Sequence, residues 1–175
     1  MRGLRRTPLH AVHRALGARF TPFAGWELPL EFAGILAEHR AVRARAGLFD
    51  VSHLGRIVVA GPGAAALLQR ALTNDLEGVR PGEAVYSPMC RDDGGTLDDL
   101  VVLRLVEDGF LLVVNAANRE RDLAWLRGLG GPGGARVRDA SDDWAVLALQ
   151  GPAAEEVLAA AASAPGRAAL SALRP

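Results

Sequence analysis

One stretch of the chain, Leu97-Asp98-Asp99-Leu100-Val101-Val102-Leu103-Arg104-Leu105, decides the fold. Its aliphatic and β-branched residues are typical of a strand. Turn-forming sequences flank it, Asp92-Asp93-Gly94-Gly95 before and Glu107-Asp108-Gly109 after, and both are hairpin signals. Two further apolar segments, Ala84–Met89 and Phe110–Asn115, lie beyond these turns. The sequence therefore predicts an antiparallel meander of three strands.

The rest of the chain mixes helix and strand patterns irregularly. Thr7-Pro8 is typical of a helix cap and first helical residue, and a turn-like segment with Pro29 leads to a longer helix that Gly47 ends. Irregular alternation with hairpins predicts an α+β fold with antiparallel or mixed sheets and packed helices, rather than a doubly wound sheet. Helices are expected at 8–16, 31–45, 64–72, 118–129 and 153–162, and further strands at 56–60, 135–138 and 145–149.

Composition excludes several classes of protein. The 175 residues suffice for one domain or two small ones, and 50% of them are hydrophobic, as in ordinary globular proteins. No apolar run approaches the ~18 residues of a membrane span, so we expect no membrane partner. The 20 acidic residues balance the 20 basic ones, so no global field attracts a nucleic acid, and we expect none as a partner.

The chain contains no Lys, which excludes a Walker A loop and Schiff-base lysine chemistry. Its single cysteine, Cys90, excludes an internal disulfide and favours a reducing, cytoplasmic location. The Arg-rich, acid-free start at 1–20 is similar to a transit peptide, but its apolar spacing favours a first helix.

The two carboxylates of the central strand are predicted to differ. Because side chains alternate, Asp99 shares a face with Leu97 and Val101 and is the one polar residue there, whereas Asp98 shares a face with Arg104. A carboxylate among aliphatic side chains needs partners, which is typical of functional carboxylates. Asp98 is expected to stay solvated near the hairpin. The alternative for Asp99 is that it caps the hairpin at the edge of the sheet.

Two polar residues can approach Asp99 from neighbouring strands of the meander, Tyr86 and Asn115. A carboxylate, a phenol and an amide on one sheet suit a flat heterocycle with N–H donors. The alternative is that Tyr86 belongs to the core and Asn115 caps the next helix. The four histidines show no metal-ligand spacing, so we expect no metal site.

Several motifs together resemble the glycine cleavage system T protein family, the aminomethyltransferases, over nearly the whole chain. In order they are Thr7-Pro8-Leu9, Phe23-Ala24-Gly25-Trp26-Glu27-Leu28-Pro29, Gly47-Leu48-Phe49-Asp50-Val51-Ser52-His53, Thr73-Asn74-Asp75, Tyr86-Ser87, Gly94-Gly95-Thr96-Leu97-Asp98-Asp99-Leu100, Val113-Val114-Asn115-Ala116 with Asp122, and Gln150-Gly151-Pro152.

The resemblance implies a reaction and a site. The methylene of an aminomethyl group, carried on the lipoyl arm of the H protein, would pass to the co-substrate tetrahydrofolate with release of ammonia. Asp99 falls on the family's essential carboxylate, implied to orient and polarise the attacking pterin nitrogen. Tyr86 and Asn115 match positions lining the folate pocket, with Val113 and Leu54 as its apolar wall.

The resemblance also implies a folate-binding, T-protein-like fold in which domain two is inserted into domain one. The expected parts are 1–52 and 141–175 for domain one, which would be incomplete, and 53–140 for domain two. The chain stops short of the family's length, which implies an N-terminal portion that is inactive alone, or a homo-oligomer formed through the apolar surface left uncovered. Two alternatives stay open: a non-catalytic folate-binding protein, and the folate domain of an enzyme like sarcosine or dimethylglycine dehydrogenase.

Overall fold

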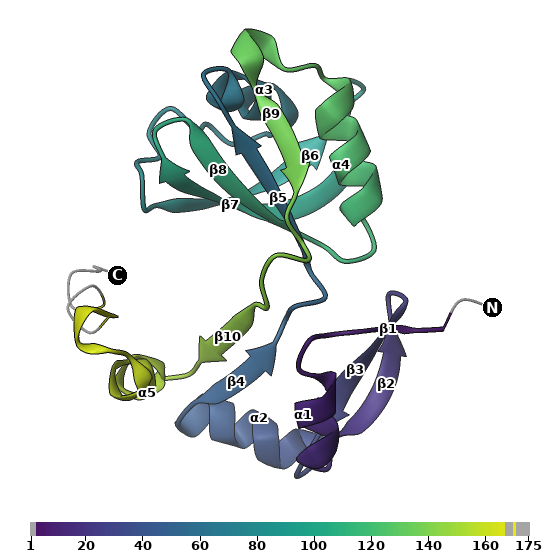
Figure 1. Cartoon of the computed structure of the whole chain (residues 1–175), viewed down its shortest axis with the longest axis vertical. Helices are drawn as coiled ribbons and strands as arrows, with labels where there is room; N and C mark the ends of the chain where they lie inside the picture. The colour runs from purple at the N-terminus through teal and green to yellow at the C-terminus, as the bar shows by residue number, and fades with distance from the viewer. Residues whose placement is uncertain (1–2, 167–169, 171–175) are drawn as a thin grey trace. The chain divides into compact units, whose positions relative to one another are not determined.

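The computed structural model describes residues 3–166 and 170, and it divides the chain into two compact units (Figure 1). The first unit comprises the chain up to Val51 and again from Ala145, and the second comprises Ser52–Trp144. The mixture of sheets and helices confirms the predicted α+β class. The assignment of these units to two domains of the family stays a prediction.

The second unit is built on one five-stranded sheet of order β6-β7-β8-β5-β9, in which every neighbouring pair is antiparallel. The predicted meander is its first part, β6-β7-β8. The elements are β5 (Gly55–Ala60), α3 (Ala64–Ala71), β6 (Ala84–Cys90), β7 (Thr96–Val106), β8 (Gly109–Val114), α4 (Arg119–Gly128), the short 3-10 helix η1 (Pro132–Gly134) and β9 (Arg136–Asp139).

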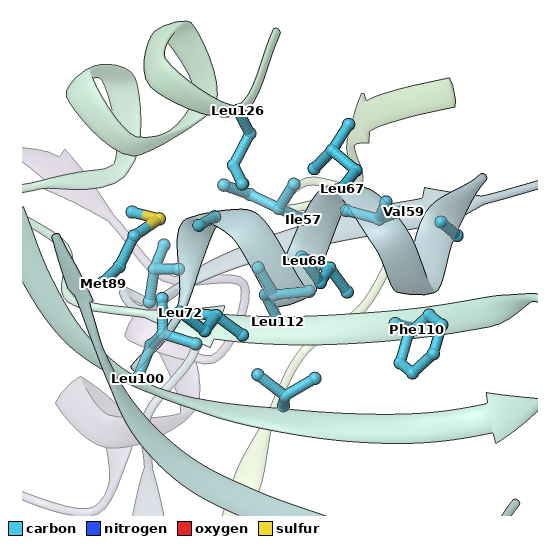
Figure 2. Close-up of a cluster of buried hydrophobic side chains, with 14 of the residues drawn as sticks. Ile57, Val59, Leu67, Leu68, Leu72, Met89, Leu100, Phe110, Leu112 and Leu126 are labelled. Atoms are coloured by element: carbon cyan, nitrogen blue, oxygen red, sulfur yellow. The ribbon is translucent and has the colours of Figure 1, made fainter. Parts of the chain in front are cut away.

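Helices α3 and α4 close one face of this sheet over a hydrophobic core. Leu67 and Leu68 of α3 and Leu126 of α4 are fully buried against Ile57 of β5 and Leu112 of β8. Figure 2 shows these side chains converging between the helices and the strands. Full burial of one such aliphatic side chain contributes about 1.5–3 kcal/mol, so this core holds the second unit together.

The described residues of the first unit include two small sheets and the helices α1, α2 and α5. One sheet has the order β1-β3-β2, with β1 parallel to β3, and the other pairs β4 antiparallel with β10. The elements are β1 (Arg5–Arg6), α1 (His10–Ala15), β2 (Arg19–Phe23), β3 (Trp26–Glu31), α2 (Ile35–Ala44), β4 (Gly47–Asp50), β10 (Leu147–Gln150) and α5 (Ala154–Ala161).

The turn-like segment predicted around Pro29 is wrong, because residues 26–31 form strand β3. Ala24 and Gly25 both have positive φ, 47° and 80°, the backbone of a two-residue turn that matches strand twist, and they join β2 to β3. The following helix starts later than predicted, at Ile35. The carboxylate of Glu38 accepts the N–H groups of Phe32, Ala33 and Gly34 at 2.6, 2.6 and 3.0 Å, which fixes the loop before the helix.

Gly151 shows why the Gln150-Gly151-Pro152 motif needs a glycine. Its φ is +118°, and a Cβ there would lie 2.6 Å from the carbonyl oxygens of both Val42 and Arg45. Any side chain would therefore force the end of α2 away from the start of α5.

Candidate functional site

The burial of the two carboxylates on β7 is the reverse of what the sequence predicted. Asp98 is only 3% exposed, whereas Asp99 is exposed to solvent. Alternation assigns the two aspartates to opposite faces but does not decide which face α3 and α4 cover. The helices cover the face of Asp98, Leu100 and Val102, so the prediction that Asp98 stays solvated is wrong.

The opposite side of β6, β7 and β8 is the open face, defined here by Tyr86, Asp99, Val101, Leu103 and Val113. Val101 lies opposite Tyr86 on one side and opposite Val113 on the other, so these side chains share a face. Val101, Leu103 and Val113 are half-buried, and Tyr86 is 57% exposed. The open face thus has an aliphatic floor with polar groups at one end.

Tyr86 and Asp99 are joined by a direct hydrogen bond in which the phenol hydroxyl donates to Asp99 Oδ2. This hydrogen bond, followed by burial and the negative charges of Asp99 and Asp98, raises the pKa of Tyr86 above its ordinary value. The phenol therefore stays protonated at neutral pH and remains the donor. The alternative that Tyr86 belongs to the core is wrong, because its ring is exposed.

Two asparagine amides anchor the backbone beneath this pair. Asn115 Nδ2 donates to the carbonyl of Asp99 at 3.0 Å, and Asn74 Nδ2 donates to the carbonyl of Tyr86 at 2.6 Å. Asn115 follows directly after β8, so its position depends on the same sheet register that sets the open face. The structure therefore brings together Asp99, Tyr86, Asn115 and Val113.

Leu54 lies immediately before β5 and is half-buried. Its carbonyl accepts a hydrogen bond from the guanidinium of Arg56, which also donates to the carbonyls of Ser52 and Trp144, both at 2.7 Å. Arg56 is only 2% exposed, and it ties the first and last segments of the second unit together. No hydrogen bond joins Leu54 to Asp99 among the described residues.

The sequence reasoning missed a polar network under the sheet. Asp98 accepts hydrogen bonds from the backbone N–H of Asn115 at 3.0 Å, from Asn115 Nδ2 at 2.8 Å and from Asn118 Nδ2 at 2.6 Å. Asp122 on α4 is fully buried, and neither of its carboxyl oxygens has a hydrogen-bond partner among the described residues. A signal was available, because residues 118, 122 and 126 follow the four-residue spacing of one helix face, and Leu126 on it was predicted to be core.

Two of the four histidines, His10 and His13, contact carboxylates of the first unit. His10 Nε2 lies 2.8 Å from Glu27 Oε2, and His13 Nε2 lies 2.9 Å from Asp50 Oδ2. Within residues 3–166 and 170, no group of three or more His, Cys, Asp and Glu side chains is placed to hold a metal. No helix in the described part of the chain has the length and apolar character needed to cross a bilayer.

The chain is similar to known proteins over nearly its whole length. A family model described as the GCVT N-terminal domain matches residues 9–170. Over 155 residues the chain is 55% identical to an aminomethyltransferase from Rubrobacter xylanophilus, covering 89% of this chain and 41% of that one. An aminomethyltransferase from Geobacillus kaustophilus is equally similar, at 55% identity, with 89% and 42% of the two chains covered.

A solved structure has the same fold. It is the crystal structure of glycine cleavage system aminomethyltransferase T from Bartonella henselae, with a TM-score of 0.86 and 42% sequence identity, covering 91% of this chain and 44% of that chain. The chain therefore spans less than half the length of each of these three relatives.

Proposed function

The chain belongs to the GCVT N-terminal domain family, and from this premise we propose that it is the tetrahydrofolate-binding N-terminal portion of a glycine cleavage aminomethyltransferase. The open face is the proposed binding surface. The observation that carries the proposal is the Tyr86–Asp99 pair, an exposed carboxylate held by a phenol above an aliphatic floor. Such a surface suits a flat, hydrogen-bonding ring system.

The floor and the carboxylate have separate roles. One side of a pterin ring would contact the apolar side chains of Val101, Leu103 and Val113. The family resemblance adds the side chain of Leu54 to this apolar surface. Asp99 is the proposed catalytic residue, because a fixed negative charge next to a pterin nitrogen orients that nitrogen and stabilises the positive charge that develops when it attacks. The amide of Asn115 keeps the backbone of Asp99 in place.

The proposed reaction transfers one carbon without any change of oxidation state. The C–S and C–N bonds of the lipoyl-bound aminomethyl group break, and two C–N bonds form to tetrahydrofolate. The two protons released from the folate nitrogens pass to the lipoyl sulfur and to the departing amine. The products are 5,10-methylenetetrahydrofolate, ammonia and the dihydrolipoyl H protein, so the lipoylated H protein is the proposed partner, in the cytoplasm.

The first test is thermal unfolding of the purified chain with and without saturating tetrahydrofolate. A ligand at about 100 times its Kd adds about 2.7 kcal/mol to the native state, so the unfolding midpoint is expected to rise. Val101→Arg is the matched disruptive variant, because it places a bulky charge on the floor of the open face and should abolish the rise. An unchanged midpoint for the unsubstituted chain would contradict a folate site in this portion.

Asp99→Asn separates binding from turnover. The amide keeps the shape of the side chain but removes its charge, so the rise in midpoint with tetrahydrofolate is expected to persist. In a full-length context, formation of methylenetetrahydrofolate from aminomethylated H protein should fall by orders of magnitude. Equal turnover in both proteins would remove Asp99 from the mechanism.

A further inference from the structure

The segment 72–74 runs along the outer side of β6, the strand that carries Tyr86. In the described part of the chain β6 ends the five-stranded sheet, with β7 as its neighbour. Leu72 forms an isolated antiparallel bridge with Met89, and the backbone N–H of Thr73 donates to the carbonyl of Pro88 at 3.1 Å. These two contacts extend the sheet by a short, irregular piece of strand, and Leu72 anchors it in the core.

At Asn74 a side chain takes over from the backbone. Its Nδ2 donates to the carbonyl of Tyr86 at 2.6 Å, and its backbone N–H donates to Ser87 Oγ at 3.1 Å. The carbonyls of alternate residues on a strand point to the same side, so those of Tyr86 and Pro88 both point away from β7. Asn74 therefore supplies to Tyr86 the donor that a further strand would supply, and it is fixed in turn by the fully buried Ser87.

This contact bears on Asp99 because Tyr86 reaches that residue along a diagonal. In the register Tyr86 lies opposite Val101. Asp99 lies opposite Pro88, two residues further along β6. Because the Cα atoms of such a diagonal pair are roughly 7–8 Å apart, only a long side chain that leans along the strand spans them. The phenol of Tyr86 does so and donates to Asp99 Oδ2, so a displacement of β6 at Tyr86 would move the hydroxyl out of reach.

We propose that Asn74 is a positioning residue of the open face, whose amide holds the sheet edge at Tyr86 so that the phenol donates to Asp99. The adjacent Asp75 has a different task, because its carboxylate accepts the backbone N–H of Glu77 at 2.9 Å. The importance of Asn74 for folate chemistry rests on the proposed function, whereas its hold on Tyr86 does not.

The hydrogen bond of the phenol can be observed by itself, because Tyr86 is the single tyrosine of the chain. Labelling tyrosine with ¹³C at the ring carbon that bears the hydroxyl gives one NMR signal, whose position depends on the hydrogen bond to Asp99. Asp99→Ala supplies the signal of the unbonded phenol. In Asn74→Ala the signal at neutral pH is expected to move from its position in the unsubstituted chain toward that of Asp99→Ala.

A pH titration of the same signal gives a second readout, which a merely structural role of Asn74 would not move. In the unsubstituted chain the hydrogen bond to Asp99, burial and the negative charges of Asp99 and Asp98 raise the pKa of Tyr86. In Asn74→Ala the phenol leaves Asp99, so its pKa should fall toward the ordinary value of about 10. A phenol that keeps both its signal position and its raised pKa in Asn74→Ala would overturn the proposal.

Asp75→Asn is the matched control in the same segment. The substitution removes the charge but keeps an oxygen that accepts the N–H of Glu77, so both readouts should stay as in the unsubstituted chain. A change as large as that in Asn74→Ala would also overturn the proposal, because any disturbance of the segment would then displace Tyr86.

A measurement on the unsubstituted chain decides the case in which Asn74→Ala does not fold. Scalar coupling across a hydrogen bond links the donor nitrogen to the carbonyl carbon, so NMR should detect a coupling between Asn74 Nδ2 and the carbonyl carbon of Tyr86. The absence of this coupling would contradict the proposal.

None of these measurements needs folate. A missing thermal response to tetrahydrofolate would therefore count against the proposed function alone. An unmoved Tyr86 signal in Asn74→Ala would count against the positioning role of Asn74 alone.

Discussion

The two faces of the sheet in the second unit differ in what covers them, although the same strands form both. The face of Asp98, Leu100 and Val102 lies under α3 and α4 and is closed to solvent. The face of Asp99 and Val101 has no comparable cover within the unit, and Leu105 at its end is 50% exposed. Two adjacent aspartates thus have opposite environments.

This comparison shows how one strand serves stability and chemistry together. The covered side fixes the backbone through packing and through the amide hydrogen bonds to Asp98. The uncovered side presents Asp99 and Tyr86 on that fixed backbone, where a ligand can reach them. Asn115 links the sides, because its side chain donates both to the carboxylate of Asp98 and to the carbonyl of Asp99.

The largest expected difference between the two faces is the loss of stability when a leucine is shortened to alanine. Leu112→Ala opens a cavity in the core and should lower the free energy of unfolding by about 2–5 kcal/mol. Leu105→Ala removes a half-exposed side chain and should change it by at most about 0.5 kcal/mol. Denaturant unfolding followed by circular dichroism measures both, and equal losses would contradict the assignment of a covered and an uncovered face.

A smaller difference in the free energy of unfolding is expected between substitutions of the two aspartates. Asp98→Asn removes the charged group that accepts hydrogen bonds from three amide donors. It should lower the free energy of unfolding by about 1.5–3 kcal/mol. Asp99→Asn changes an exposed side chain, so it should change the free energy of unfolding by no more than about 0.5 kcal/mol. The same denaturant measurement compares them, and a greater loss for Asp99→Asn would reverse the roles assigned here.

On the covered side, the buried carboxyl group of Asp122 should make stability depend on pH. Asp122 has a pKa of about 8 when folded, above its ordinary value of 3.8, so the folded state binds its proton more tightly than the unfolded state does. That contribution is fully present below pH 3.8 and is lost as the pH rises through 8. The stability of the unsubstituted chain should therefore fall relative to that of Asp122→Asn over this window. Thermal unfolding at several pH values tests this, and parallel curves would contradict it.

The smallest expected effect is that of Tyr86→Phe. The ring is 57% exposed and its hydroxyl bonds only an exposed carboxylate, so the free energy of unfolding should change by less than about 0.5 kcal/mol. The variant should nevertheless weaken the response to tetrahydrofolate, because Asp99 loses the donor that orients it. A large loss of stability would mean that Tyr86 is part of the core.

Local sequence signals predicted most of the fold. The hairpin turns flanking β7 predicted the meander, and the helices α3, α4 and α5 lie within a few residues of their expected positions. The β2–β3 hairpin escaped prediction because its turn is Ala24-Gly25 rather than the common asparagine–glycine type, and because Pro22 and Pro29 lie within its strands.

The candidate site was predicted only in part. Period-two alternation separated Asp98 from Asp99, but both faces of β7 carry aliphatic residues, so composition did not identify the covered one. The deciding factor is the packing of α3 and α4 on one face, which the alternation within β7 does not specify. The hydrogen bonds that Asn115 and Asn118 donate to Asp98 are likewise a product of this packing.

The claim that tetrahydrofolate binds the open face is tested most directly by titrating the labelled chain with tetrahydrofolate and recording ¹H–¹⁵N NMR spectra. We expect the shifts to be confined to the open face and its anchors. The signals of Tyr86, Asp99, Val113 and Asn115 should move most, while those of Leu67 and Leu126 on the covering helices stay constant. Shifts that centre on the covering helices or on the first unit, or no shifts at saturating folate, would contradict the account.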